Sequence, residues 1–241
     1  MKAAVIGANG QLGSDLTAEL RRRSWDVVGL THADLRVEEY PEVRRVMQEL
    51  RPDVVFNTAA FHIVPQCETD PVRAFQVNAL GPLNVARACG EIGIRSVYYS
   101  TDYVFDGRTR RPYTEEDAPN PINVYATTKL AGEHFTLNNG TNNLVIRVCG
   151  LYGRIPCRAK GTNFVFTMVK AAKEKPEVKV VDDERLSPTS TKAVAAKSLD
   201  LLDTDALGLF HMVSEGVCSW YEFAKVIFET LRLSTPLEPP V

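Results

Sequence analysis

The stretch 5-VIGANGQLG-13 places three glycines, Gly7, Gly10 and Gly13, between a short apolar run and a segment with helical spacing. Glycines at a strand-to-helix turn let the backbone bend sharply and approach a pyrophosphate, whose charge the first amide N–H groups of the helix can hold. The spacing GxxGxxG differs from the GxGxxG of the standard fingerprint, so plain turn geometry is the alternative interpretation. Because the glycines follow the first apolar run of the chain, we interpret them as a dinucleotide-binding loop.

Five apolar runs are short, rich in β-branched or aromatic residues and not alternating, which is typical of strands buried on both faces. They cover residues 2–6, 26–30, 53–57, 95–100 and 143–148. Segments with helical spacing lie between them, at residues 11–23, 40–50, 70–93 and 125–137. This alternation predicts an α/β fold of the Rossmann type, a doubly wound parallel sheet with helices on both faces.

The pattern loosens after residue 150, with helices expected at 162–174, 190–202 and 219–232 and short strands at 178–181 and 208–213. We therefore expect a dinucleotide-binding Rossmann domain over residues 1–150 and mainly a smaller C-terminal substrate-binding lobe over 151–241. Elements at about 176–202 are expected to return to the Rossmann domain. Residues 233–241 contain three prolines and are expected to form a frayed tail.

The charge balance of the 241-residue chain argues against a nucleic-acid partner. Lys and Arg number 28 and Asp and Glu 30, without a long block of either sign. The N-terminus lacks the features of a signal peptide, and no 18-residue apolar run follows. We expect a cytoplasmic protein without a membrane partner.

The cysteines and histidines give no metal-binding pattern. Five cysteines include no CxxC pair, and their odd number cannot close completely into disulfides, so free buried thiols are expected. The four histidines include no HxxxH or HExxH pair. We assign no metal site.

The run 98-YYSTDYVFDG-107 ends a predicted strand on Ser100, Thr101, Asp102 and Tyr103. The carboxyl ends of strands in open parallel sheets are where ligands bind. A hydroxyl at this strand end could hydrogen-bond a reacting oxygen, and Thr101 is the candidate for that role.

The segment 124-VYATTKL-130 places Tyr125 and Lys129 four residues apart, on one face of a predicted helix. A phenol titrates near ~10, and bringing its pKa to neutrality takes about 4 kcal/mol, at about 1.36 kcal/mol per unit. A partly desolvated ammonium one turn away can supply much of this. A YxxxK pair alone is a weak signal, but with the glycine loop and Thr101 it predicts one site in which Tyr125 transfers a proton.

The end of the second predicted strand bears weakly on the choice of cofactor. An acid there would bind a ribose 2′-OH and repel a 2′-phosphate, but the chain offers Thr31 and His32, with Asp34 coming later. NADPH is therefore preferred and NADH remains possible. For His32, a phosphate contact and a solvated loop side chain are both open interpretations.

Five segments, GANGQLG, RPDVVFNTAA, STDYVFDG, NVYATTKLAGE and VVDDERLSPT, occur in this order. With them the chain resembles the extended short-chain dehydrogenases/reductases, and more narrowly the dTDP-4-dehydrorhamnose reductase family, from residue 1 to about 232. The resemblance implies an NAD(P)H-dependent oxidoreductase that reduces the C4 ketone of a nucleotide-linked 4-keto-6-deoxysugar, foremost dTDP-4-dehydrorhamnose to dTDP-L-rhamnose. It also implies that Thr101, Tyr125 and Lys129 form the catalytic set.

The same resemblance implies two sets of binding residues. Those expected to line the cofactor are Gly7, Asn9, Gly10, Gln11, Leu12, His32, Asp34, Leu35, Ala59, Ala60, Ser100, Tyr125 and Lys129. Those expected to face the nucleotide sugar are Val64, Asp102, Tyr103, Asn163, Phe164, Arg185 and Pro188. Turn structure is the alternative for Asn163 and Pro188. Gly150 stands where the family commonly carries an aromatic residue that packs beside the sugar.

Two other functions remain open. The regulatory subunit of methionine adenosyltransferase resembles the same branch and shares the TDYVFDG segment, which would make this chain a dinucleotide-binding module without catalysis. An epimerase or dehydratase of a nucleotide sugar would keep the fold and retain bound NAD. A homodimer is a further possibility, since family members are often dimers.

Overall fold

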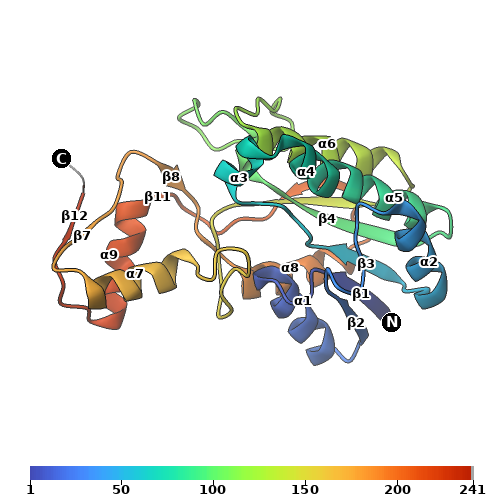
Figure 1. Ribbon diagram of the computed structural model, residues 1–241, viewed down its shortest axis with the longest axis horizontal. Coiled ribbons are helices and arrows are strands. Elements are labelled where there is room, and N and C mark those ends of the chain that lie inside the picture. Colours follow the sequence, from blue (N-terminus) through green and yellow to red (C-terminus); the bar gives the residue numbers. More distant parts are fainter. Residues whose placement is uncertain (240–241) are drawn as a thin grey trace.

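The computed structural model describes residues 1–239 of the chain. At its centre six parallel strands lie in the order β2-β1-β3-β4-β5-β10 (Figure 1). The strands are β1 (Lys2–Ile6), β2 (Asp26–Leu30), β3 (Val54–Asn57), β4 (Arg95–Thr101), β5 (Leu144–Val148) and β10 (Gly208–His211). The five strands predicted from the N-terminal apolar runs all form.

Helices cover both faces of this sheet. They are α1 (Gln11–Arg22), α2 (Tyr40–Leu50), α3 (Val64–Thr69), α4 (Pro71–Phe75), α5 (Gly81–Gly90), α6 (Val124–Asn138) and α8 (Thr191–Leu202). Along β1, Ala3 and Val5 pack with α1 and α8, whereas Ala4 and Ile6 pack with α2 and α5. Because successive strand residues face opposite sides, a run without polar alternation is buried on both. The predicted Rossmann-type, doubly wound fold is confirmed.

The single helix expected over residues 70–93 is instead interrupted. A π-helical turn, η1 (Gln76–Leu80), separates α4 from α5. Pro82 has no N–H with which to bond the carbonyl of Asn78 four residues earlier, which disturbs the helical ladder. That carbonyl accepts a hydrogen bond from the Tyr98 hydroxyl at 3.0 Å instead. The short helix α3 is not among the helices predicted from the sequence.

A smaller lobe is built from α7 (Phe164–Glu174) and α9 (Trp220–Leu231), which share an apolar core and lie apart from the sheet (Figure 1). Two short strands, β7 (Val178–Lys179) and β12 (Leu237–Glu238), pair parallel at its edge. The expectation of a frayed tail is therefore wrong for Leu237–Glu238, and residues 240–241 lie outside the described part. The pairing supplies backbone hydrogen bonds that the proline content did not reveal.

Two further strand pairs and α8 connect the lobe with the sheet. β8 (Arg185–Leu186) pairs with β11 (Cys218–Ser219), and β6 (Leu151–Tyr152) pairs with β9 (Thr189–Ser190). The helix α8 packs against α1, and β10 completes the sheet beside β5. The proposed boundary between residues 150 and 151 stays a prediction.

All five cysteines are free, but they are not all buried. Cys67, Cys89 and Cys149 are buried, whereas Cys157 and Cys218 are partly exposed, so the expectation of buried thiols is wrong for these two. Both lie in or beside loops outside the central sheet. Among residues 1–239, no helix combines the length and apolar character needed to cross a membrane.

The substitution Gly132→Ala tests the packing of α6. A Cβ at this position would lie 2.3 Å from the Asn78 carbonyl oxygen and 2.7 Å from the Tyr98 hydroxyl. We expect the free energy of unfolding, measured by urea denaturation, to fall by about 1–3 kcal/mol through overpacking. Gly90→Ala is the matched control, because its Cβ would meet nothing closer than 3.4 Å. A Gly132→Ala variant as stable as Gly90→Ala would contradict this packing.

Candidate active site

Thr101, the last residue of β4, is fixed by hydrogen bonds on both sides of its hydroxyl. The oxygen accepts from the backbone N–H of Tyr103 at 3.2 Å and donates to Oδ1 of Asp102 at 3.1 Å. It thereby caps the short 3₁₀ turn η2 (Asp102–Val104). The side chain is 6% exposed. The end of the central strand therefore presents an oriented hydroxyl.

The start of α6 brings Tyr125 to this strand end. Asn123 caps the helix by accepting from the N–H of Ala126 at 2.8 Å. The Tyr125 ring meets the Tyr103 ring edge-on, with 6.0 Å between centroids. The nearby Thr101 side chain opposes the rise in the pKa of the Tyr125 phenol. Sequence spacing and the strand-end rule thus bring these residues together.

Lys129, one turn further along α6, is buried. Only 2% of the residue is exposed, its Nζ donates to the Tyr99 carbonyl oxygen at 2.5 Å, and the same atom lies 4.1 Å from the centroid of the Tyr98 ring. Burial lowers the pKa of Lys129 to about 7, and the charge of Glu133 opposes that shift. Burial thus disfavours the charged form of the amine.

The expectation that Lys129 lowers the pKa of Tyr125 is not met in the structure. Burial raises the pKa of Tyr125 well above its usual value, and the nearby Asp102 carboxyl adds to the rise. Desolvation disfavours a phenolate and an ammonium alike, which explains why the two groups shift in opposite directions. Tyr125 therefore holds its proton at neutral pH.

Asp102 follows Thr101 and is paired with a group that sequence reasoning missed. Burial raises its pKa, while the nearby Cys149 thiol and the hydrogen bond from Thr101 oppose the rise. Cys149 comes directly after β5, and Val148, the residue before it, pairs with Thr101 across the sheet. The rule that ligands meet strand ends could have found Cys149, which was considered only as a thiol.

The glycine loop is compact in a way that only glycine allows. Gly7 has a φ of +79°, and a Cβ there would lie 2.6 Å from Oγ1 of Thr58. A Cβ at Gly13 would lie 2.2 Å from the Gly7 carbonyl oxygen. The loop leads into α1, whose first turn carries no acidic side chain. Amide donors at a helix start without a competing carboxylate fit a dinucleotide pyrophosphate.

The other residues expected at the cofactor differ in which of their groups can face a ligand. Ala59 lies beside the glycine loop, since its N–H would be 3.3 Å from a Gly7 Cβ. The Asp34 carboxylate accepts from the N–H and hydroxyl of Thr31 at 2.8 and 2.7 Å, and His32 is exposed. Leu35 is 2% exposed and belongs to the core between α2 and α5, so only its backbone can face a ligand.

Asn163, predicted at the sugar nucleotide, also has a structural role. It caps α7, and its amide donates to Oε1 of Gln11 at 3.1 Å and to the Gly153 carbonyl at 2.8 Å. The segment before α7 is thereby tied to the first residue of α1. The Asn163 amide fixes the segment before α7 beside the glycine loop. The predicted turn role of Asn163 and its predicted contact with the sugar nucleotide are therefore compatible.

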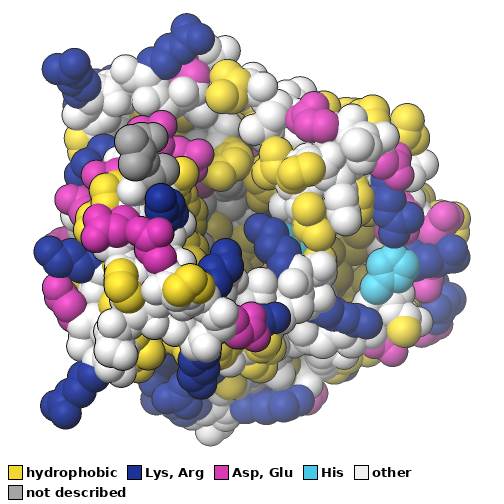
Figure 2. Space-filling model, turned by 60° about the vertical axis from the view of Figure 1, so that its left-hand side comes forward, with side chains coloured by type: hydrophobic (Ala, Val, Ile, Leu, Met, Phe, Trp, Pro, Cys, Tyr) yellow, Lys and Arg dark blue, Asp and Glu magenta, His cyan; other side chains and the backbone are white. Residues whose placement is uncertain are grey.

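The remaining residues predicted for the substrate are spread over both parts of the molecule. Phe164 stacks on Phe223 in the smaller lobe at 5.3 Å between centroids, and Arg185 lies 3.6 Å from Glu222 at the lobe surface. Val64 begins α3. The surface is hollowed near the centre of Figure 2, with hydrophobic side chains visible in the recess. The assignment of Val64, Phe164 and Arg185 to the substrate stays a prediction.

Gly150 has a φ of +51°, and a Cβ there would lie 2.8 Å from Leu186 Cδ1 and 3.3 Å from the Cα of Pro188. The aromatic residue common at this position in the resembled family would therefore need a different local backbone. The structure offers no side chain there to pack beside a sugar.

Comparison with protein families and curated relatives gives consistent matches. The family model described as the RmlD substrate binding domain matches residues 1–241. The chain is 37% identical over 236 residues to the spore coat polysaccharide biosynthesis protein SpsK of Bacillus subtilis, covering 98% of this chain and 81% of that protein. It is 39% identical over 231 residues to the dTDP-4-keto-6-deoxy-D-glucose reductase of Streptomyces niveus, covering 94% and 77%.

Among solved structures, the chain is similar to the dTDP-4-dehydrorhamnose reductase of Bacillus anthracis in complex with NADP. The TM-score is 0.94 at 36% sequence identity, and the match covers 99% of this chain and 84% of the other. The similarity therefore includes both the sheet and the smaller lobe.

The substitution Lys129→Met tests the burial of the amine. Because the pKa of Lys129 falls from 10.5 to about 7 on folding, the unfolded chain binds more protons than the folded one between these values. The free energy of unfolding of the native chain should rise with pH across that window. The stability of Lys129→Met relative to the native chain should fall by about 2 kcal/mol from pH 6 to pH 9, measured by urea unfolding.

The control for this measurement is Lys170→Met, at a lysine whose side chain is 73% exposed. Its stability relative to the native chain should change little between the two pH values. An equal pH response of the two variants would show that Lys129 is not desolvated.

Proposed function

The chain belongs to the RmlD family, and from this premise we propose that it uses NADPH to reduce the C4 ketone of a nucleotide-linked 4-keto-6-deoxysugar. The substrate we favour is dTDP-4-dehydrorhamnose, with dTDP-L-rhamnose as the product. Support comes from the Bacillus anthracis reductase with bound NADP and from the reductase of Streptomyces niveus. Support also comes from the position of Thr101 at the end of β4, of Tyr125 in the first turn of α6 and of Lys129, buried one turn further along that helix.

In this proposal NADPH bound at the glycine loop would supply the hydride for the ketone carbon. Tyr125 donates its phenolic proton to the ketone oxygen as negative charge develops there. Its raised pKa keeps Tyr125 protonated before the reaction, and proton donation then requires stabilisation of the phenolate that forms. The Thr101 hydroxyl, fixed by Asp102 and Tyr103, orients the same oxygen.

Lys129 has two parts in the proposed mechanism. In its protonated form, Lys129 stabilises the phenolate that forms when Tyr125 donates its proton. The residue is also expected to contact the nicotinamide ribose, as the family resemblance implies. The glycine loop from Gly7 to Leu12 is expected to hold the pyrophosphate with backbone N–H groups.

Tyr125→Phe should lower kcat for ketone reduction by about 10²- to 10⁴-fold, the range supplied by a positioned acid. The assay follows the loss of NADPH absorbance with dTDP-4-dehydrorhamnose, and NADPH affinity is measured separately by fluorescence. Tyr40→Phe is the matched control, because the Tyr40 hydroxyl bonds Glu91 at the surface of α2. Turnover that survives Tyr125→Phe would overturn the proposed role.

The choice among related functions can be made with the same protein. A panel of nucleotide sugars, each tested with NADPH and NADH, separates dTDP-4-dehydrorhamnose from other 4-keto sugars. Tight dinucleotide binding with no ketone reduction and a stoichiometric protein partner would favour the non-catalytic regulatory subunit. NAD that copurifies with the chain would favour an epimerase or dehydratase.

A cytoplasmic location, expected from the sequence, and a homodimer, implied by the resemblance, are included in the proposal. Light scattering of the purified chain measures the oligomeric state directly. A monomer would remove the homodimer without affecting the proposed chemistry.

A further inference from the structure

A cysteine–histidine pair lies outside the residues used by the proposed reduction. The Cys157 sulfur is 2.9 Å from Nε2 of His62. The other ring nitrogen of His62, Nδ1, is 3.3 Å from the carbonyl oxygen of Ala60. The two residues are 95 positions apart in the chain. The contact therefore joins the segment between β3 and α3 to the segment between β6 and α7.

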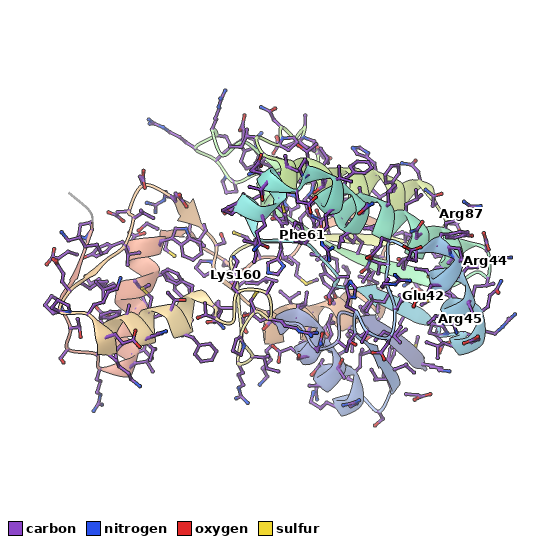
Figure 3. All side chains as sticks on the ribbon, in the orientation of Figure 1. Glu42, Arg44, Arg45, Phe61, Arg87 and Lys160 are labelled. Atoms are coloured by element: carbon purple, nitrogen blue, oxygen red, sulfur yellow. The ribbon has the colours of Figure 1, made fainter. Side chains whose placement is uncertain are left out.

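The backbone around Cys157 holds the thiol in place. Its N–H donates to the Thr162 carbonyl at 3.1 Å, and its own carbonyl accepts from the N–H of Lys160 at 3.2 Å. Figure 3 places Phe61, the neighbour of His62, and Lys160 on loops in the middle of the molecule. Cys157 is only partly buried, so the residue combines these backbone hydrogen bonds with partial exposure to solvent.

The charges around this sulfur favour the thiolate. Burial alone would raise the pKa of Cys157, but the hydrogen bond and charge of His62, together with the backbone and charge of Lys160, lower it to about 7. His62 acts from the segment after β3, and Lys160 acts from the segment of Cys157 itself. By contrast, burial raises the pKa of Cys218, the other partly exposed cysteine.

We propose that Cys157, paired with His62, is a modification site for small disulfides such as oxidised glutathione. The thiolate attacks one sulfur of the disulfide, and the bond between the two reagent sulfurs breaks. A new bond forms between Cys157 and the attacked sulfur, and the other half leaves as a thiolate. The Cys157 sulfur is oxidised and the departing half is reduced, so no further oxidant is needed.

The modification has a structural consequence at the border of the glycine loop. The mixed disulfide removes the thiolate that His62 contacts and inserts a peptide-sized group between the two segments. One of these segments contains Ala59 and Ala60, and the other leads to Asn163, which bonds Gln11. The reaction itself requires only the thiol and the imidazole, so it can be tested whether or not the chain reduces a sugar.

The test treats the full chain with oxidised glutathione over a range of pH and follows the added mass on each cysteine by peptide mapping. We expect the rate at Cys157 to rise with a midpoint near pH 7 and to exceed the rate at Cys218. Cys157→Ser should lose this rapid addition, and Cys218→Ser should keep it. A midpoint near pH 9, or equal rates at Cys157 and Cys218, would overturn the proposal.

The variant His62→Gln isolates the part played by the imidazole. Without it the pKa of Cys157 should move toward the ordinary value of 9.0. A thiolate of higher pKa is more nucleophilic but less populated, so we expect the rate at pH 7 to fall about five- to tenfold and the rate above pH 9 to rise. An unchanged rate profile would remove His62 from the site.

Lys160→Gln provides a second variant at an exposed position, and it should slow the reaction at pH 7 by a smaller factor. Circular dichroism of both variants checks that the fold is retained. The comparison of Cys157 with Cys218 in the unaltered chain decides the proposal even if His62→Gln does not fold.

Discussion

The buried ion pair between Glu133 and Arg147 fixes the helix on which the proposed chemistry depends. The side chains are 3% and 4% exposed, and Arg147 donates from Nε and Nη2 to the two carboxylate oxygens at 2.9 and 2.7 Å. Ser100 donates to the same carboxylate. Removing one partner would leave an uncompensated buried charge, which costs about 3–5 kcal/mol. The pair therefore locks α6 against β4 and β5, with Glu133 one turn beyond Lys129.

A second constraint holds α6 close to η1. Gly132 allows the helix to approach η1 so closely that a methyl group would strike the Asn78 carbonyl. That carbonyl is available to the Tyr98 hydroxyl because Pro82 cannot donate to it. Tyr98 in turn lies beneath the Lys129 amine. Packing among η1, Gly132 and the Tyr98 ring thus sets the position of the Lys129 amine.

Sequence patterns predicted the parallel sheet and the candidate site because both depend on local rules. Uninterrupted apolar runs mark doubly buried strands, and a strand end beside a helix with four-residue spacing brings Thr101 near Tyr125. The patterns did not predict the contact of Cys149 with Asp102 or the strand at Leu237–Glu238. These features depend on which segments pack together across the fold, and such packing leaves no periodic trace in the chain.

The ionisation of Tyr125 and Lys129 shows most clearly what the sequence patterns do not predict. Four-residue spacing indicates a cation near the phenol, but it says nothing of how much water each group loses. In the folded protein desolvation is the larger effect, so the pKa of Tyr125 rises while that of Lys129 falls. Negative charge developing on a ketone oxygen would draw the proton from Tyr125, and the resulting phenolate would favour a protonated Lys129. Burial thus keeps Tyr125 protonated and disfavours the charged form of Lys129 before the reaction. The negative charge formed during the reaction then favours proton donation by Tyr125 and protonation of Lys129.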